Sequence, residues 1–180
     1  DVEESTFSKL PDYDRVLMVL EGEVVLSYEG ERVARLKTLE QDRFDGAWNT
    51  KSFGKITDYN LMVRKGCEGY LDIIAPETEK KEYKTSEETS KSLITHVLYC
   101  KEGYFIASIS GQTQMVKTGE LLVIEGEKDE SVRYSLMGEG TIIRAQIFQD
   151  GMEDEVGPEI IPKEKATFED FKQCIFLANT

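Results

Sequence analysis

A repeat within the chain constrains the fold more than any other feature. Three short motifs occur twice, at a constant offset of 81 residues from Val16 to Val97. The first copies are Val16-Leu17, Glu21-Gly22 and Gly30, and the second copies are Val97-Leu98, Glu102-Gly103 and Gly111. Both copies lie in alternating apolar and polar sequence that ends at a glycine turn, which is typical of β-hairpins. The repeat therefore predicts a duplicated β-barrel with two pockets.

Alternation along the first copy gives the strand faces. Arg15, Leu17 and Val19 fall on one face of a strand, and Val16, Met18 and Leu20 fall on the other. Similar short strands, separated by glycine turns, recur along the chain without helical periodicity between them. This pattern favours an all-β sandwich or barrel over a parallel sheet with crossover helices.

The repeat and the composition together predict the domain boundaries. We expect a first barrel over residues 1–76, a polar linker over 77–92 and a second barrel over 93–150. The linker contains almost no core-forming side chains and is therefore expected to be solvated. Residues 151–180 form a C-terminal extension that packs on the barrels.

The extension is expected to end in a short helix. Thr167 can cap it, since a threonine oxygen accepts from the first free backbone N–H groups. The face packed on a barrel would carry Phe168, Phe171 and Ile175.

Charge and cysteine content exclude several classes of protein. The 180 residues include 22 Lys and Arg against 35 Asp and Glu, a net charge of −13. Nucleic acids and anionic membrane surfaces require clustered cations, so neither is expected as a partner. The three cysteines are widely spaced and form no CxxC motif, which argues against a disulfide framework and against a zinc cluster. With no signal peptide or apolar span in the sequence, a cytoplasmic location is expected.

Few residues are available for metal or nucleophilic chemistry. His96 is the single histidine, so a histidine-rich metal site cannot form. No acidic calcium loop, P-loop, dinucleotide fingerprint or nucleophile elbow is present. We therefore expect no metal and no cofactor, and we assign no catalytic residue. A structural role for His96 is favoured over a catalytic one.

Arg15 is the most suggestive single residue, because it opens the first strand of the first repeat. An arginine in a barrel mouth can hold a carboxylate through two parallel hydrogen bonds. The alternative is a surface salt bridge with Asp12 or Asp14, and the residues alone do not separate the two. The position that matches Arg15 in the second repeat is His96.

Four further residues are candidates for the first pocket. Phe44 and Trp48 could form its wall or belong to the core. Asp45 could accept a hydrogen bond from a ligand N–H or bond only to its own turn. Asn60 could contact a ligand or make a buried structural hydrogen bond.

Several segments carry a resemblance to a known family. They are Phe7-Ser8-Lys9-Leu10-Pro11, the strand from Asp14 to Gly22, Phe44-Asp45-Gly46-Ala47-Trp48, and Asp58-Tyr59-Asn60-Leu61-Met62. In this order and spacing they resemble the HutD family of bicupins, within the cupin superfamily, most closely over residues 1–66. The tryptophan and glycine run with which such chains usually begin has no counterpart before Phe7. Whether a preceding native segment completes the pocket is therefore left open.

The resemblance implies a fold and a function. The fold would be a tandem pair of cupin barrels, and the function would be restraint of histidine utilisation in bacteria. The ligand would be a small carboxylate metabolite such as urocanate or formiminoglutamate. Arg15 would hold its carboxylate, and Asp45 or Asn60 would meet its nitrogen end. The first barrel is then the working site and the second a supporting one, with homodimer formation left open.

An enzymatic function is the alternative. A metal-independent isomerase, epimerase or lyase of the cupin type could use Asp45, Glu21 or His96 as its acid or base. With one histidine and no coherent acid–base pair, binding without catalysis is the favoured interpretation.

Overall fold

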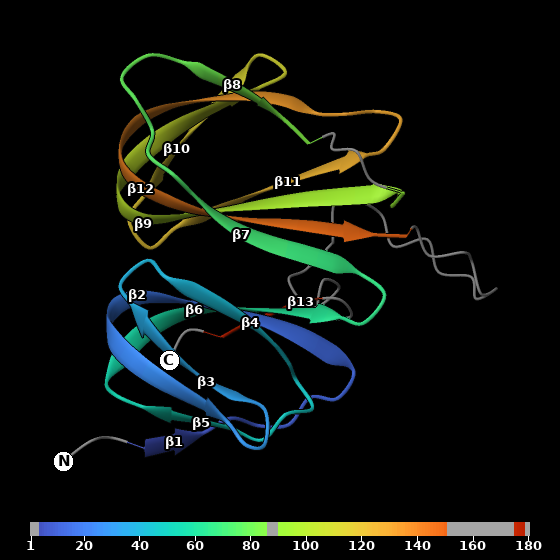
Figure 1. Ribbon diagram of the computed structural model, residues 1–180. Coiled ribbons are helices and arrows are strands. Elements are labelled where there is room, and N and C mark those ends of the chain that lie inside the picture. Colours follow the sequence, from blue (N-terminus) through green and yellow to red (C-terminus); the bar gives the residue numbers. More distant parts are fainter. Residues whose placement is uncertain (1–3, 86–89, 151–174, 179–180) are drawn as a thin grey trace. The chain divides into compact units, whose positions relative to one another are not determined.

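The strands of the protein belong to two compact units. In the computed structural model, which describes residues 4–85, 90–150 and 175–178, every regular element is a β-strand (Figure 1). Unit 1 comprises Asp1–Cys67 together with Asp154–Thr180, and unit 2 comprises Glu68–Glu153. Each unit has its own sheet, seven-stranded in unit 1 and six-stranded in unit 2.

The sheet of unit 1 is organised around one long strand. Its strands are β1 (Glu4–Thr6), β2 (Tyr13–Tyr28), β3 (Arg32–Lys37), β4 (Gln41–Asp45), β5 (Thr50–Phe53), β6 (Ile56–Arg64) and β13 (Ile175–Ala178). The first half of β2 pairs with β4 and β6, and its second half pairs with β3 and β5. β1 extends the sheet beyond β5, and β13 extends it beyond β6. All of these pairings are antiparallel.

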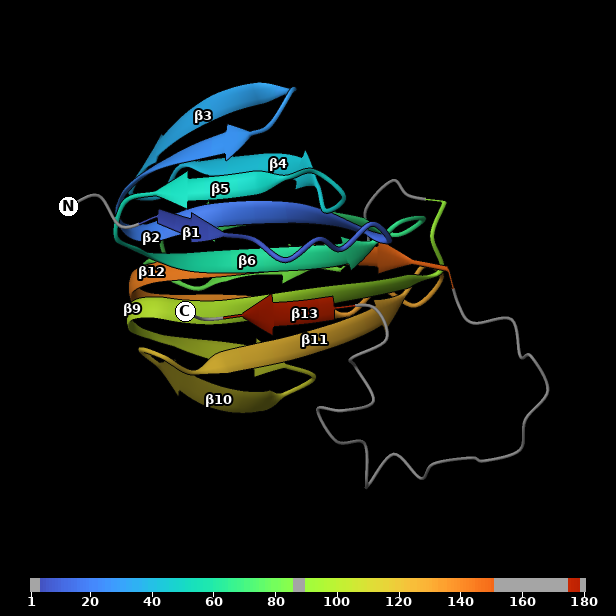
Figure 2. The same cartoon turned by 90° about the horizontal axis from the view of Figure 1, so that it is seen from below.

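The sheet of unit 2 has two long strands that pair along their full length. Its strands are β7 (Glu68–Ile74), β8 (Lys81–Lys84), β9 (Leu93–Ile109), β10 (Gln112–Lys117), β11 (Leu121–Glu127) and β12 (Arg133–Gln149). The long pair is β9 and β12 (Figure 2). Its register shifts between Thr141 and Ile142. β11 and β7 flank one half of this pair, and β10 and β8 flank the other.

The pairing confirms the duplication predicted from the repeat. β2, β3 and β4 correspond to β9, β10 and β11, and β5 with β6 corresponds to the single strand β12. The outer strands β1 and β13 correspond to β8 and β7. The chain thus supplies the last strand of unit 1 from its C-terminal end.

Two glycines of the repeat explain how the long strands bend. Gly22 and Gly103 have φ angles of 90° and 79°, which L-residues with a side chain rarely adopt. A Cβ atom at Gly22 would collide with the carbonyl oxygen of Lys55, and one at Gly103 with that of Glu139. Glycine is therefore required at the point where each long strand changes partners.

Each unit has a core of its own. The unit 1 core contains Leu17, Val19, Val24, Leu26, Tyr28, Leu36 and Phe44. The unit 2 core contains Ile74, Leu98, Cys100, Phe105, Ala107, Val116, Ile124, Tyr134, Leu136 and Ile142. On β2, the core residues Leu17 and Val19 lie on the strand face that the alternation assigns to Arg15.

Two parts of the predicted architecture are not confirmed. No strand pairing among the described residues joins the edge strands of either sheet, so closure into two barrels is not observed. The prediction of a C-terminal helix is wrong at Ile175, which begins strand β13 and pairs with Val63 of β6. An unpaired strand edge provides backbone hydrogen bonds that local helical periodicity does not reveal. The rest of the predicted helix lies outside the described residues.

The unit boundaries also differ from those expected. β7, placed in the first barrel by the sequence, pairs with β12 of unit 2. β8 lies within the stretch expected to be a linker and also pairs with β12. Within this polar strand, the ring of Tyr83 stacks on that of Tyr134, with ring centroids 5.5 Å apart.

Candidate functional site

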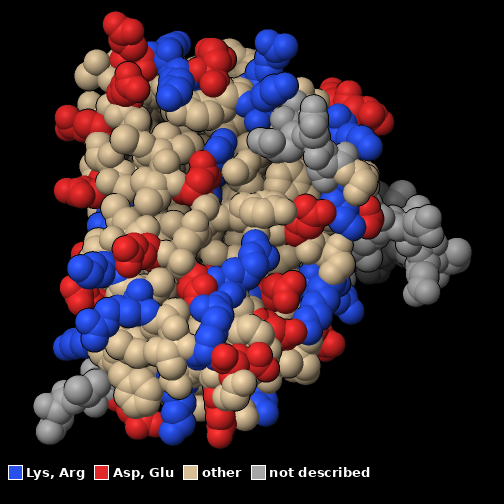
Figure 3. Space-filling view, in the orientation of Figure 1, with Lys and Arg blue, Asp and Glu red and all other residues tan. Residues whose placement is uncertain are grey.

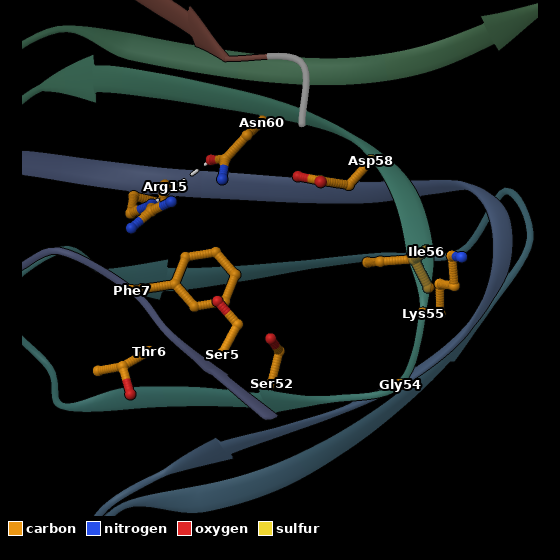
Figure 4. A pocket seen from close by; sticks show the side chains of 10 residues that line it. All are labelled: Ser5, Thr6, Phe7, Arg15, Ser52, Gly54, Lys55, Ile56, Asp58 and Asn60. Atoms are coloured by element: carbon orange, nitrogen blue, oxygen red, sulfur yellow. Dashed lines mark hydrogen bonds between the residues drawn. The ribbon is translucent and has the colours of Figure 1, made fainter. Parts of the chain in front are cut away.

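A cavity of about 420 Å³ lies in unit 1, lined by residues of β1, β2, β5 and β6 and the segments beside them. Figure 4 shows the side chains around it. The residues used below are Ser5, Phe7, Arg15, Ser52, Asp58 and Asn60. In the register of β2 and β6, Asn60 lies opposite Leu17 and Asp58 opposite Val19. Both therefore share the core face of the sheet with Arg15.

Arg15 is a buried cation in the cavity wall, 5% exposed. Its Nε donates to Asn60 Oδ1 and its Nη1 to the carbonyl oxygen of Ser8, both at 3.4 Å (Figure 4). These separations are longer than usual for such bonds. Among the described residues Arg15 forms no ion pair, so the salt bridge with Asp12 or Asp14 is not observed.

Burial determines the electrostatics of Arg15. Loss of solvent lowers the pKa of the guanidinium, while the negative charge of Asp58 acts in the opposite sense. An arginine stays charged even so. The cavity wall therefore carries a positive charge whose hydrogen-bonded partners in the described structure are neutral oxygen atoms.

Two aromatic rings hold the guanidinium in place. Its central carbon lies 4.6 Å from the ring centroid of Phe7 and 5.3 Å from that of Phe44. The rings contact each other edge to face at 6.1 Å. Phe44 is 3% exposed and belongs to the core. Of the two, Phe7 lines the cavity, and Phe44 supports Arg15 from behind.

Asp58 lines the cavity but is not one of the five site residues predicted from the sequence. It is 7% exposed, and its carboxylate lies on the same side of the cavity as the Asn60 amide (Figure 4). The sequence contained a signal for it, because Asp58 precedes Asn60 by two residues and shares its strand face. Ser5 and Ser52 add hydroxyl groups to the lining.

Asp45 and Trp48 do not line this cavity. The Asp45 carboxylate accepts from the backbone N–H of Ala47 and from Lys65 Nζ, and both contacts lower the pKa of Asp45. Trp48 packs against the unit 1 core, with its ring 5.5 Å from that of Tyr28. The Arg32 guanidinium also lies near it, 5.8 Å from the ring centroid. Of the five candidates, the structure thus brings Arg15 and Asn60 into the cavity with Phe44 behind them.

His96 has a different environment from its counterpart Arg15. It is fully buried, and its Nδ1 lies 2.8 Å from the Tyr134 hydroxyl. Burial, with a smaller contribution from the charge of Arg144, lowers the pKa of His96 to about 4. The imidazole is therefore neutral at pH 7.

No metal centre or long apolar helix is found in the part of the chain that the structure describes. No group of three or more His, Cys, Asp or Glu residues is placed to hold a metal ion there. This part of the chain also contains no helix long and apolar enough to cross a membrane. On the face shown in Figure 3, cationic and anionic side chains are interspersed.

The family is decided by comparison with known proteins. A family model described as HutD matches residues 1–143. The chain belongs to the HutD family. No curated protein matches it. The segments that resemble the HutD family all lie within the matched residues.

Solved structures support the HutD assignment at the level of the fold. A conserved protein of unknown function from Pseudomonas aeruginosa PAO1 is similar at 20% identity and a TM-score of 0.68, covering 83% of this chain and 76% of that one. HutD from Pseudomonas fluorescens SBW25, in a formate condition, is similar at 19% identity and a TM-score of 0.62, covering 83% of this chain and 76% of that one. YhaK from Escherichia coli has 12% identity and a TM-score of 0.58, and the match covers 83% of each chain.

Proposed function

We propose that this HutD-family protein binds a small carboxylate metabolite in the unit 1 cavity, with Arg15 as the anchor. In this proposal it is a binding protein of the bacterial cytoplasm that restrains histidine utilisation, and not an enzyme. The observation that carries the proposal is the buried Arg15 guanidinium, which lines the cavity without an ion pair among the described residues.

The hydrogen-bonding capacity of Arg15 supports a carboxylate ligand. A guanidinium has five N–H donors, and the described residues accept from two of its nitrogens over long distances. A carboxylate can accept two parallel, charge-assisted hydrogen bonds from such a group. Because the Phe7 and Phe44 rings already fix the guanidinium plane, little conformational entropy is lost on binding.

Asp58 supports a ligand that also carries a nitrogen donor. A plain carboxylate in this cavity would be repelled by the Asp58 carboxylate, which lines the same space. A ligand with an N–H group at its other end would donate to Asp58 and remove that penalty. Urocanate and formiminoglutamate both combine a carboxylate with a nitrogen donor. Asp58 thus takes the role that the sequence offered to Asp45.

The test compares urocanate with its methyl ester, which keeps the imidazole and loses the negative charge. Titration calorimetry should give saturable binding of urocanate and at least tenfold weaker binding of the ester. Formiminoglutamate and histidine extend the series. Equal affinity for acid and ester, or no binding of any of these compounds at millimolar concentration, would contradict the proposal.

Trp48 fluorescence is a poor probe for this test. Trp48 packs on Tyr28 and Arg32 and does not line the cavity. Calorimetry and thermal shift report binding without relying on its position.

The enzymatic alternative gains no support from the geometry. Asp45 is bound to Lys65, Glu21 is exposed, and His96 belongs to the other unit. No acid–base pair formed by these three residues is therefore placed at the cavity.

A further inference from the structure

The two units place their polar core-face residues at matching strand positions. In unit 1, Arg15 lies on β2, and Asn60 lies on β6 opposite Leu17. In unit 2, the position matching Arg15 holds His96 of β9. The position matching Asn60, opposite Leu98, holds Arg144 of β12. Among these matched positions, the arginine lies on the first strand of the pair in unit 1 and on the second strand in unit 2.

The arginine of unit 2 is already bound to a carboxylate. Arg144 Nε donates to Asp72 Oδ1 at 2.9 Å, and Arg144 Nη2 donates to Asp72 Oδ2 at 2.6 Å. This is the two-bond arrangement in which an arginine holds a free carboxylate. The carboxylate comes from β7, where Asp72 lies directly opposite Arg144.

Unit 1 has no carboxylate at the equivalent position. The strand that corresponds to β7 is β13, and the residue of β13 opposite Asn60 is Ala178. The two units therefore differ in whether the outer strand brings a carboxylate to the arginine.

The remaining polar groups of the unit 2 site are neutral. Arg144 also hydrogen-bonds to Tyr134, whose hydroxyl lies 2.8 Å from His96 Nδ1. Burial opposes the charged form of Arg144, but its bonds to Asp72 and Tyr134 outweigh this effect and raise its pKa. The positive charge of Arg144 is thus matched by one carboxylate, that of Asp72.

We propose that unit 2 contains a second carboxylate-binding site, centred on Arg144, which the protein's own Asp72 fills. The side chain of Arg144 is 14% exposed and that of Asp72 is 38% exposed, so the carboxylate closes the site from its solvent side. Removing Asp72 opens a site for a free monocarboxylate such as acetate. Together with the proposed function of unit 1, this predicts one metabolite molecule bound per chain.

The test is rescue of Asp72→Ala by acetate. The melting temperature of the full-length variant is measured in sodium acetate and in sodium chloride at equal ionic strength. With 100 mM acetate, the acetate-specific rise should exceed that of the wild type by roughly 3 °C, as expected for a dissociation constant of about 20 mM. The double variant Asp72→Ala/Arg144→Met should lose this excess. If Asp72→Ala does not fold, Asp72→Asn provides the same comparison.

The outcomes distinguish this inference from the proposed function. Any acetate binding at Arg15 would show as a shift in the wild type that is lost in Arg15→Met, whatever happens in unit 2. The inference about Asp72 depends only on the excess shift that Asp72→Ala shows over the wild type. No excess, or an excess that persists after Arg144→Met, would overturn it.

Discussion

Arg15 Nε donates to the side-chain oxygen of Asn60 at 3.4 Å, and this contact joins the neighbouring strands β2 and β6 inside the unit 1 cavity. The bond is long, and its acceptor is neutral. Asn60 therefore orients the guanidinium without neutralising it. In unit 2, Arg144 occupies the position that matches Asn60 and is instead neutralised by Asp72.

Asn60→Asp should convert the unit 1 cavity into a self-filled site. The substitution changes one side-chain amide into a carboxylate of the same shape and places it beside Arg15. The internal ion pair then competes with a ligand carboxylate, so the affinity for urocanate should fall at least tenfold in titration calorimetry. Asn49→Asp adds the same charge at an exposed position and should leave the affinity within twofold. Retained affinity in Asn60→Asp would count against Arg15 as the anchor.

Asp58→Asn should change ligand preference. The variant loses the negative charge that would pair with a ligand nitrogen and repel a plain carboxylate. Affinity for urocanate should fall about tenfold, which is about 1.4 kcal/mol, while that for a carboxylate lacking nitrogen should rise. Asp45→Asn is the matched control, because Asp45 bonds to Lys65 outside the cavity. Equal effects of the two substitutions would remove Asp58 from the binding site.

His96 should make stability depend on pH. Burial and the charge of Arg144 lower its pKa to about 4 in the folded protein, against about 6.5 in the unfolded chain. Between these values the unfolded chain binds the proton and the folded protein does not. The free energy of unfolding therefore falls as pH falls through this window, by about 2 kcal/mol between pH 7 and pH 5.

Urea denaturation of the wild type and of His96→Gln measures this dependence. The side chain of the glutamine variant does not titrate in this range. Between pH 7 and pH 5, its free energy of unfolding should therefore fall by about 2 kcal/mol less than that of the wild type. Parallel pH profiles for the two proteins would show that His96 is not the group responsible.

The glycines at the strand bends should be sensitive to substitution. Gly22→Ala and Gly103→Ala each combine a positive φ with a collision against backbone, so each should lower the unfolding free energy by about 2–4 kcal/mol. Gly30 and Gly111 have similar φ angles, but open space lies around them. Alanine there should cost about 1 kcal/mol. Equal costs at bend and turn would mean that φ alone determines the effect.

The duplicated β-architecture could be predicted from the sequence because its signals are local. Alternation gave the faces of β2, and the repeat gave the equivalence of β2 with β9. The placement of β7 and β13 could not be predicted, because it depends on pairing between segments far apart in the chain. Local periodicity suggested a helix at Ile175, while the edge of β6 pairs with a strand there.

Part of the candidate site could also be predicted from the sequence, namely Arg15 and Asn60, whereas Asp58 could not. Arg15 was singled out because it opens the first strand of the repeat, and Asn60 because it is a polar residue within a strand. The sequence left open whether Arg15 faces a pocket or forms a surface salt bridge. Asp45 and Asp58 are both aspartates near the predicted pocket, and only pairing geometry separates them. Asp45 ends β4 and contacts Lys65, whereas Asp58 lies within β6 and lines the cavity.

The most direct test of the central claim is the dissociation constant of urocanate for Arg15→Met, measured by titration calorimetry beside the wild type and Arg32→Met. Methionine keeps much of the length of the side chain and removes its charge. Arg32 pairs with Asp42 in the same unit and does not line the cavity. The account predicts at least tenfold weaker binding in Arg15→Met, equivalent to about 1.4 kcal/mol or more, and unchanged binding in Arg32→Met. Wild-type affinity in a folded Arg15→Met protein would contradict it.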